Sequence, residues 1–248
     1  MICQRAVLVG DAHLGRGSPE TERAFLAFLE TVPTLGDGLV VTGDLFEFWF
    51  SYRRAVPRRN LAVVAALATL RRKVPILLVG GNHDRWGGDF WGEDFGIEFE
   101  PLVGRFELNG RSAAVIHGDG ITESHWSGRL LQRLTRNRVT IGLFHAIHPD
   151  VGFWLIDHLS GVLGDRERTE TEIRTAAAHQ AGWARNTLQE EPALGLLAMG
   201  HTHRPAVDGE PGKLYVNPGA WFDGYRYAIV SAAGAELCQF RFEGSASA

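Results

Sequence analysis

The sequence predicts an α/β and α+β protein in which two mixed sheets carry helices on their outer faces. Up to residue 84, apolar runs, polar loops and helical segments alternate as they do in βαβ units. Residues 95–120 and 214–242 instead hold closely spaced strand signals, which indicate antiparallel sets. A chain of 248 residues has the length of one domain. We expect that domain to span residues 1–242, with a helical cap inserted at about 121–193 and a frayed tail at 243–248.

Five short apolar runs are expected to form buried strands, because each is rich in aliphatic residues and stops at glycine or a polar side chain. These runs are Ala6–Val9, Leu39–Val41, Ile76–Val79, Ala113–Ile116 and Leu196–Met199. Between them, Pro19 to Thr31 is expected to be a helix with Ser18 as its N-cap. A second helix is expected from Pro57 to Lys73, with its valines and leucines on the buried face.

The later strands are predicted from turn signals. Asn109-Gly110 separates Phe106–Leu108 from Ala113–Ile116, and Asn-Gly between strands is a strong hairpin signal. Another strand is expected at Phe99–Pro101. A further antiparallel set is expected at the end of the chain, from Leu214–Val216, Tyr225–Val230 and Ala235–Phe242. Glu167 to Leu188 is expected to be a charged amphipathic helix that closes the insert.

Each of the five apolar runs leads into a side chain that can bind a metal. The residues concerned are Asp11, His13, Asp44, Asn82, His83, Asp84, His117, His201 and His203. Ligands collect at the carboxyl ends of strands in open α/β sheets, so these side chains are expected to meet. Oxygen donors mixed with imidazoles suit Mn, Fe, Co, Ni or Zn. So many ligands predict two ions, which is the usual arrangement for hydrolysing phosphate esters.

Composition limits the classes of protein. The net charge of −4 and pI of about 6.2 argue against a general nucleic-acid binder, which needs a broad basic surface. With only Cys3 and Cys238 there is no disulfide framework, and a reducing cytoplasm fits. The N-terminus lacks the apolar region of a secretory signal, and no uninterrupted apolar segment reaches about 18 residues. We therefore expect a cytoplasmic protein.

The insert carries two features, and each has more than one interpretation. Arg129, Arg133 and Arg136 share one helical face, which would either grip a phosphate or lipid surface or be a solvated face. The apolar segment from Val139 to Leu163 would either line an acyl-chain tunnel, or rest on a bilayer, or be ordinary core. Together they favour an amphipathic substrate.

Phe46 and Phe48 are expected to pack beneath the loop after Asp44, and Trp49 is left open between packing and substrate contact.

The ligand blocks resemble those of the calcineurin-like metallophosphoesterases, whose pattern is D-x-H, G-D, G-N-H-D/E, H and G-H-x-H. All five blocks occur here in that order, across residues 11–203. The resemblance implies a four-layer α/β/β/α sandwich of two mixed sheets. It also implies that Asp11, His13 and His203 hold one metal, that Asn82, His117 and His201 hold the other, and that Asp44 bridges them. His83 would face the phosphoryl oxygens or the leaving group, and Asp84 would orient it.

A narrower resemblance is to the UDP-2,3-diacylglucosamine diphosphatase family. It is carried by residues 43–49, 117–119, 200–205 and 219–221, and it is weakest between about 125 and 190. It implies hydrolysis of a pyrophosphate to UMP and 2,3-diacylglucosamine 1-phosphate (lipid X) in lipid A biosynthesis. Two divalent ions, foremost Mn²⁺, and peripheral contact with the cytoplasmic face of the inner membrane are implied as well. The expected substrate contacts are Asn82, His83, His125, Arg129, Arg133 and His201.

Two other functions stay open at this point. The same fold can act on another phosphodiester or phosphomonoester, although a soluble substrate needs no apolar cap. A metal-binding scaffold without activity is the third possibility, against which the complete ligand set argues. Oligomeric state and acyl-chain length leave no trace in the sequence.

Overall fold

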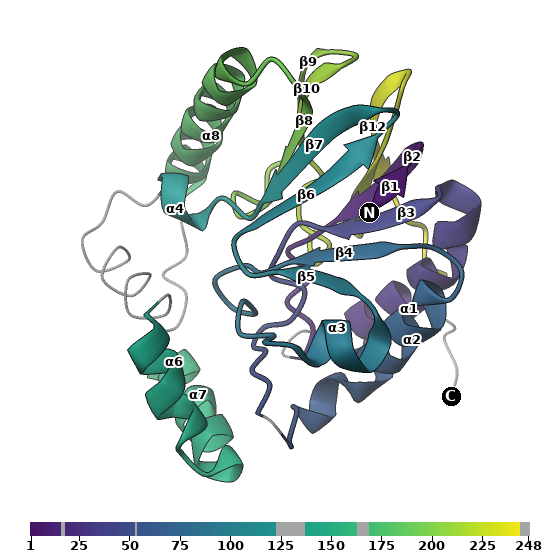
Figure 1. Ribbon diagram of the computed structural model, residues 1–248. Helices are drawn as coiled ribbons and strands as arrows, with labels where there is room; N and C mark the ends of the chain where they lie inside the picture. Colours follow the sequence, from purple (N-terminus) through teal and green to yellow (C-terminus); the bar gives the residue numbers. More distant parts are fainter. Residues whose placement is uncertain (16–17, 53, 123–136, 163–168, 244–248) are drawn as a thin grey trace.

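Figure 1 shows the fold as a computed structural model, which describes residues 1–15, 18–52, 54–122, 137–162 and 169–243. One six-stranded sheet, sheet A, has the order β1-β6-β7-β8-β10-β9. Its strands are β1 (Ile2–Cys3), β6 (Val103–Leu108), β7 (Arg111–Ile116), β8 (Leu194–Met199), β10 (Lys213–Asn217) and β9 (Ala206–Glu210). The other, sheet B, has the order β12-β11-β2-β3-β4-β5. Its strands are β12 (Gly234–Gln239), β11 (Arg226–Ser231), β2 (Arg5–Val9), β3 (Gly38–Val41), β4 (Ile76–Val79) and β5 (Glu98–Glu100).

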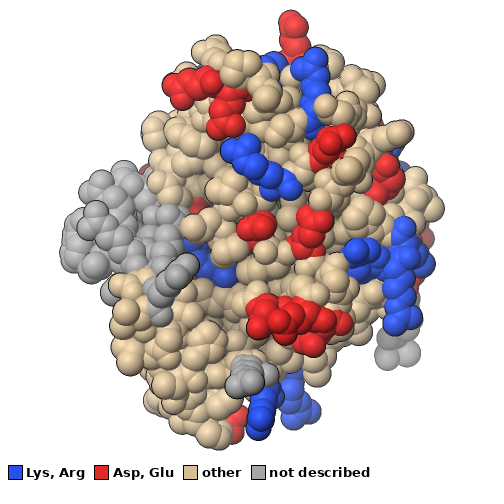
Figure 2. Space-filling view, in the orientation of Figure 1, with Lys and Arg blue, Asp and Glu red and all other residues tan. Residues whose placement is uncertain are grey.

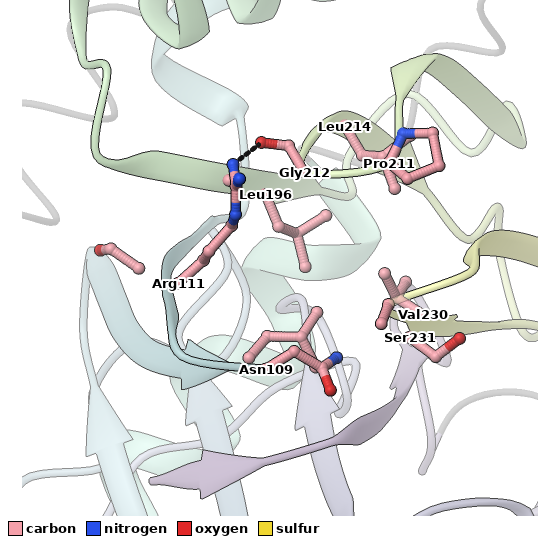
Figure 3. A pocket seen from close by; sticks show the side chains of 12 residues that line it. Asn109, Arg111, Leu196, Pro211, Gly212, Leu214, Val230 and Ser231 are labelled. Atoms are coloured by element: carbon pink, nitrogen blue, oxygen red, sulfur yellow. Dashed lines mark hydrogen bonds between the residues drawn. The ribbon is translucent and has the colours of Figure 1, made fainter.

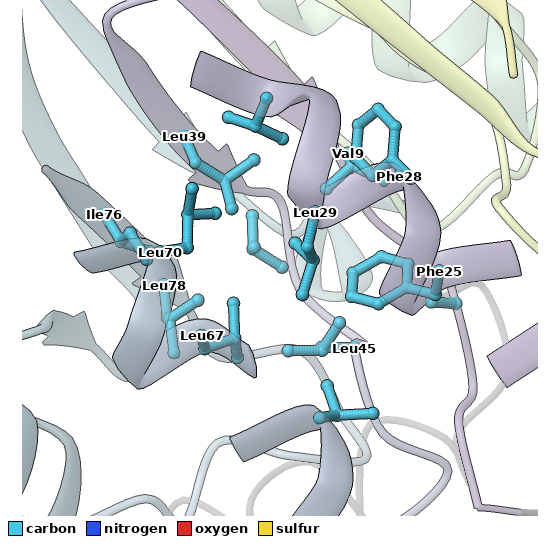
Figure 4. Close-up of a cluster of buried hydrophobic side chains, with 14 of the residues drawn as sticks. Val9, Phe25, Phe28, Leu29, Leu39, Leu45, Leu67, Leu70, Ile76 and Leu78 are labelled. Atoms are coloured by element: carbon cyan, nitrogen blue, oxygen red, sulfur yellow. The ribbon is translucent and has the colours of Figure 1, made fainter. Parts of the chain in front are cut away.

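Alternating side chains of the strands build three apolar layers. Val7 and Val9 of β2 belong to the cluster that includes Phe25, Phe28 and Leu67 of the outer helices (Figure 4). Their neighbours Ala6 and Leu8 point the other way, into a cluster that also holds strand residues of sheet A. A third cluster joins sheet A to Ala184 and Leu188 of α8 (Glu170–Glu190). This alternation is what strands buried on both faces require.

The result is a four-layer α/β/β/α sandwich, as the sequence predicted. Figure 1 shows α8 on one side of the two sheets and α1 (Pro19–Leu35) with α2 (Leu61–Arg71) on the other. The shorter helices are α3 (Phe90–Phe95), α4 (Asp119–Thr122), α6 (Arg138–His145) and α7 (Pro149–Val162). Ser18 caps α1 by accepting a hydrogen bond from the amide of Thr21 at 3.2 Å, which confirms its expected role.

All five apolar runs are strands, and their directions are what the site needs. β2, β3 and β4 are parallel neighbours in sheet B, and β7 and β8 are parallel neighbours in sheet A. Their carboxyl ends therefore meet at one edge of each sheet. The hairpin at Asn109-Gly110 is also confirmed, because Leu108 pairs with Arg111 and both turn residues have positive φ.

Several details differ from the prediction. The strand predicted at Phe99–Pro101 is β5, and it pairs parallel with β4 instead of joining a hairpin. The run at Leu214–Val216 pairs parallel with β8 and antiparallel with β9, so the last segment is not a purely antiparallel set. The predicted helix from Pro57 begins as a 3₁₀ turn at Arg58–Asn60, and α2 proper starts at Leu61. Pairing partners are decided by tertiary packing, which local patterns do not contain.

The insert forms helices in its described part. α6 and α7 attach to the sandwich through aromatic rings: Phe144 contacts Phe50 with ring centroids 4.5 Å apart, and Trp86 at 5.5 Å. Phe153 contacts Tyr52 at 5.7 Å. The outer side of this α6–α7 hairpin exposes apolar side chains, namely Val139, Leu143, Val151 and Trp154. Ordinary core is therefore the wrong interpretation for these four residues. No helix in the described ranges is both long and apolar enough to cross a bilayer.

Candidate metal centre

The loops that follow the five parallel strands bring the predicted ligands together. Asp11 and His13 follow β2, Asp44 follows β3, and Asn82 follows β4, all in sheet B. His117 follows β7, while His201 and His203 follow β8, so these three come from sheet A. The cluster therefore spans the end of the sandwich, with ligands from both sheets.

The backbone of these loops is held in an unusual conformation. Seven non-glycine residues in the described chain have positive φ, and five of them are expected ligands: Asp11, His13, Asp44, His201 and His203. Each such residue costs about 1–3 kcal/mol and persists only where surrounding contacts fix it. Gly43, with φ of +105°, shows how little room is left, because a Cβ there would lie 2.5 Å from Nδ1 of His117.

The ligand atoms form one continuous cluster around Asp44. The donor atoms of Asp11, His13 and His203 lie within 4.8 Å of one another, as do those of Asp11, Asp44 and His117. Nε2 of His13 lies 3.8 Å from Asp44 Oδ2, and Nε2 of His117 lies 3.1 Å from the same oxygen. The Asp44 carboxylate thus lies between two groups of donors.

The second group of donors is equally close. Nε2 of His117 lies 3.2 Å from Oδ1 of Asn82 and 3.3 Å from Nδ1 of His201. His13 offers a direct test of whether a cation fits, because its Nε2 is buried and has no hydrogen-bond partner. An unpartnered imidazole nitrogen beside carboxylates is what a divalent cation of the Mn-to-Zn series would bind. The residues present therefore fit a metal centre.

Charge in the cluster favours a cation as well. Burial lowers the pKa of His13, but its hydrogen bond to Glu47 and the carboxylates of Asp44 and Asp11 outweigh burial and raise it to about 9. Burial also opposes the charged form of His117, yet Asp44 and Asp11 raise its pKa to about 10. The pKa of Asp44 is lowered well below its usual value despite burial, because histidines surround it. The protonated imidazoles supply the positive charge that a bound metal ion would otherwise supply.

Backbone and carboxylate acceptors orient the imidazoles. Nδ1 of His117 lies 3.0 Å from the carbonyl oxygen of Thr42, and Nδ1 of His13 lies 2.9 Å from Oε2 of Glu47. Such contacts hold Nε2 as the ligand atom. Nδ1 of His83 lies 2.8 Å from the backbone carbonyl oxygen of Glu47. His83 therefore sits in the cluster with its ring held by the loop after Asp44.

The structure gives Asp84 a different environment from the one expected. Its buried carboxylate accepts backbone hydrogen bonds from four residues of the two neighbouring loops: Gly81, Asp44, Leu45 and Phe46. The His83 ring is held by Glu47 instead. Asp84 joins the β3 and β4 loops, because a carboxylate with several lone pairs can collect amide donors from both. Arg85 likewise joins two loops: its guanidinium donates a hydrogen bond to the Asp119 carboxylate at 2.6 Å, which connects the loop after β4 to the segment after β7.

Two neighbours of the cluster were not predicted. Glu47 holds both His13 and His83, and its place in the Gly43–Trp49 motif is the only signal for it. Phe222 is 46% exposed, and its ring contacts His13 at 5.5 Å and His203 at 4.9 Å. Among the aromatic residues after Asp44, Phe46 is buried as expected. Trp49 is buried too and stacks on Phe46 at 4.9 Å, so packing is its role.

His125, Arg129, Arg133 and Arg136 lie outside the described residues.

A separate pocket of about 220 Å³ lies at the opposite ends of the strands, near Arg111 and Gly212 (Figure 3). Arg111 begins β7 whereas His117 follows its end, so this pocket is distinct from the ligand cluster. Basic and acidic side chains are interspersed on the face seen in Figure 2, which shows no broad basic surface there.

Comparison with known proteins agrees with this geometry. The family model for calcineurin-like phosphoesterases matches residues 5–205. A UDP-2,3-diacylglucosamine hydrolase of Shewanella piezotolerans is 27% identical, over 96% of this chain and 99% of the relative. One of Stutzerimonas stutzeri is 29% identical, over 85% of this chain and 88% of the relative.

Solved structures show the same fold at low identity. An archaeal phosphodiesterase superimposes with a TM-score of 0.51 at 13% identity, over 95% of this chain and 99% of that one. The vacuolar protein sorting 29 protein of Cryptosporidium parvum gives 0.50 at 14% identity, over 97% and 93%. These likenesses concern the fold alone.

Proposed function

As a member of the calcineurin-like phosphoesterase family the chain is a metal-dependent hydrolase, and we propose that it cuts the pyrophosphate of UDP-2,3-diacylglucosamine. The products would be UMP and lipid X, a step of lipid A biosynthesis. The observation that carries this proposal is the convergence of all seven ligand side chains at one end of the sandwich. The relatives named for this substrate align over nearly the whole chain, which supports the choice of substrate.

The proposed ligand assignment follows the two groups of donors. Asp11, His13 and His203 would hold one ion, and Asn82, His117 and His201 would hold the other. Asp44 would be shared, because its carboxylate lies between the two groups. Mn²⁺ is the ion that we propose, with Fe, Co, Ni and Zn as the alternatives that the donor set admits. When bound, two such ions would lower the pKa of a bound water towards neutrality and would neutralise phosphoryl oxygens.

Two accessible residues are proposed to act on the substrate. Asn82 is exposed and His83 is half-buried, whereas most of the ligands are buried. Nδ1 of His83 faces a carbonyl oxygen, which can only accept, so that nitrogen carries a hydrogen. Nε2 is then the nitrogen left for the substrate, and in the imidazolium form of the ring it donates a proton or hydrogen bond to the phosphoryl group or leaving oxygen. Asn82 is proposed to stabilise the equatorial oxygens with its amide.

The lipid part of the substrate is assigned to the insert. Trp86 and Phe50 follow the β4 and β3 ligand loops directly, and both contact Phe144 of α6. The apolar α6–α7 hairpin therefore stands beside the metal loops, where acyl chains would extend from the reacting pyrophosphate. We assign His125, Arg129, Arg133 and His201 to the remaining head-group contacts. The exposed residues Val139, Leu143 and Trp154 support peripheral contact with the cytoplasmic face of the inner membrane.

Product analysis tests this function directly. The Mn²⁺-loaded protein is incubated with UDP-2,3-diacylglucosamine and, separately, with a chromogenic phosphodiester, beside an Asp44→Ala control. Formation of UMP and lipid X at a far higher rate than the generic product is expected, with both reactions abolished by chelation. Turnover of the generic ester alone would keep the metal centre and reject the lipid substrate. Activity that survives both chelation and Asp44→Ala would reject the metal centre.

Membrane contact has its own experiment. Sedimentation with vesicles that contain anionic lipid is compared for the native chain and for Trp154→Ser combined with Leu143→Ser. These side chains are exposed, so folding is expected to be unaffected. Weaker sedimentation of the double variant is expected, and equal sedimentation would refute the assignment of the hairpin to the bilayer.

A further inference from the structure

A single buried amide reaches the loops that carry three of the proposed ligands. Gln180 lies on α8 with no exposed surface, and it is the polar member of a buried helix face whose other members are Ala184 and Leu188. A buried glutamine in an apolar face is costly unless its amide is fully bonded. Every polar atom of this side chain has a partner, so its place is specified by the network around it.

The partners of Gln180 belong to the loop between the two last ligands. Its Nε2 donates to the carbonyl oxygen of Gly200 at 3.0 Å. Its Oε1 accepts from the hydroxyl of Thr202 at 3.1 Å. Gly200 precedes His201, and Thr202 separates His201 from His203. Since both histidines have positive φ, this loop needs external contacts to keep its shape, and Gln180 supplies two of them.

A second layer of contacts fixes the orientation of the amide. Tyr215 donates its hydroxyl to Oε1 of Gln180 at 3.0 Å, and burial raises the pKa of that phenol to about 12, so it stays a donor. Asn217 donates from Nδ2, which lies 3.1–3.2 Å from Gly200 O, Thr202 Oγ1 and Gln180 Oε1. These donors leave Oε1 as the acceptor side, which directs Nε2 to Gly200.

The same amide also packs against the loop after β7. Gly118 follows His117 with φ of +109°, and a Cβ at that position would collide with Nε2 of Gln180. The β7 and β8 loops, which carry His117, His201 and His203, therefore meet on one side chain. The N-terminal end of α8 contacts the loop after β8 again, because Glu170 forms an ion pair with Arg204 at 2.6 Å.

We infer that Gln180 is a positioning residue that holds the ligand loops of sheet A in their metal-binding shape and links the insert to the metal centre. α8 closes the insert that begins after His117, so docking of this helix and the shape of both loops depend on the same hydrogen bonds. The inference rests on the ligand assignment proposed above. Groups that hold metal ligands in place change metal affinity by about 10–100-fold when they are removed.

The test compares metal binding in matched variants. Gln180→Met keeps the volume of the side chain and removes its hydrogen bonds, while Leu188→Ala opens a cavity beneath the same helix without removing one. Thr202→Val cuts the same contact from the loop side and serves if Gln180→Met fails to fold. His201→Ala controls for the metal centre itself. Mn²⁺ affinity is measured by titration calorimetry, the visible spectrum of the Co²⁺-loaded protein reports ligand geometry, and melting of the metal-free protein reports stability.

We expect Gln180→Met and Thr202→Val to weaken Mn²⁺ binding by about tenfold or more and to change the Co²⁺ spectrum. Leu188→Ala should lower the melting temperature at least as much and keep the native affinity and spectrum. Native affinity in Gln180→Met or Thr202→Val, with affinity lost in His201→Ala, would overturn the inference and leave the metal centre standing. Equal loss in Leu188→Ala would overturn it too, because general loosening of α8 would then explain the effect. Native affinity in His201→Ala would instead reject the proposed ligands.

Discussion

Replacing Asp84 by Asn separates a structural carboxylate from a catalytic one. The Asp84 carboxylate accepts four backbone hydrogen bonds, at 2.7–3.2 Å, from the loops after β3 and β4. Asparagine keeps the shape but turns one oxygen into an NH₂ group that faces two backbone donors. Leaving a buried donor unpaired costs about 1–3 kcal/mol, so two unpaired amides cost about 2–6 kcal/mol. Burial and the neighbouring Asp44 raise the pKa of Asp84, so removing its charge offsets part of this cost. Typical domains unfold at about 5–15 kcal/mol, so this is a large share.

Urea unfolding of the metal-free protein, followed by tryptophan fluorescence, measures this change as a lower midpoint. His83→Ala is the matched control, because the half-buried His83 ring has one hydrogen bond, worth about 1 kcal/mol, to the Glu47 carbonyl. We expect His83→Ala to lose activity with little loss of stability, and Asp84→Asn to lose stability. An Asp84→Asn variant with the native midpoint and the activity of His83→Ala would refute the reasoning, since Asp84 would then act on His83.

Three more predictions follow from the geometry of the centre. His13 and His117 have pKa values raised to about 9 and 10, so at neutral pH each carries a proton that a metal must displace. Below these values the Mn²⁺ affinity of each of the two proposed sites should rise with pH by up to about tenfold per unit, and titrations at pH 6.5, 7.5 and 8.5 measure it. A pH-independent affinity would contradict this. Gly43→Ala should abolish metal binding on the His117 side of the centre, because the new Cβ would lie 2.5 Å from the His117 ring. Equilibrium dialysis should then find at most one ion per chain, and two ions per chain would contradict the expectation. Gly152→Val should push the α6–α7 hairpin away from Tyr52, because the Tyr52 hydroxyl occupies the space that the new side chain needs. The rate of hydrolysis of the lipid substrate should then fall by about tenfold or more, while a generic phosphodiester is cleaved at the native rate. Equal loss of activity on both substrates would argue against a hairpin that positions the lipid.

Much of the centre could be predicted because its residues follow strand signals that are local. Ala6–Val9 and Leu196–Met199 are short apolar runs that stop at Gly10 and Gly200, and the ligands come next in the chain. Parallel pairing then brings Asp11 and Asp44 together within sheet B, and His117 and His201 within sheet A. That the two edges meet at one end of the sandwich depends on how the sheets pack, which the family resemblance implied and the local patterns do not contain. The four-layer arrangement follows from the same alternation of faces, which places Val7 against helices and Leu8 against the other sheet.

What the sequence did not reveal depends on contacts between loops. The family resemblance implied that Asp84 orients His83, but a buried carboxylate binds whichever amide donors surround it. Glu47 and Gln180 have no local pattern of their own, since a polar residue in a motif or on a helix is ordinarily solvated. The pairing of β10 with β8 and the edge strand β9 were missed for a similar reason: Ala206–Glu210 is half polar and contains glycine.

The strand order of sheet B sets when the centre can form during synthesis. β2, which leads into Asp11, lies between β3 and β11, and β11 begins 221 residues after β2 begins. A nascent chain therefore carries Asp11 on a strand with one open edge until Arg226–Ser231 leaves the ribosome, and it lacks His201 and His203 for most of that time. Contacts over such separations form late and slowly. We therefore expect the full ligand set to form only after the β8 loop has been made, because a chain that ends before His201 holds only Asp11, His13, Asp44, Asn82 and His117 of the proposed ligands.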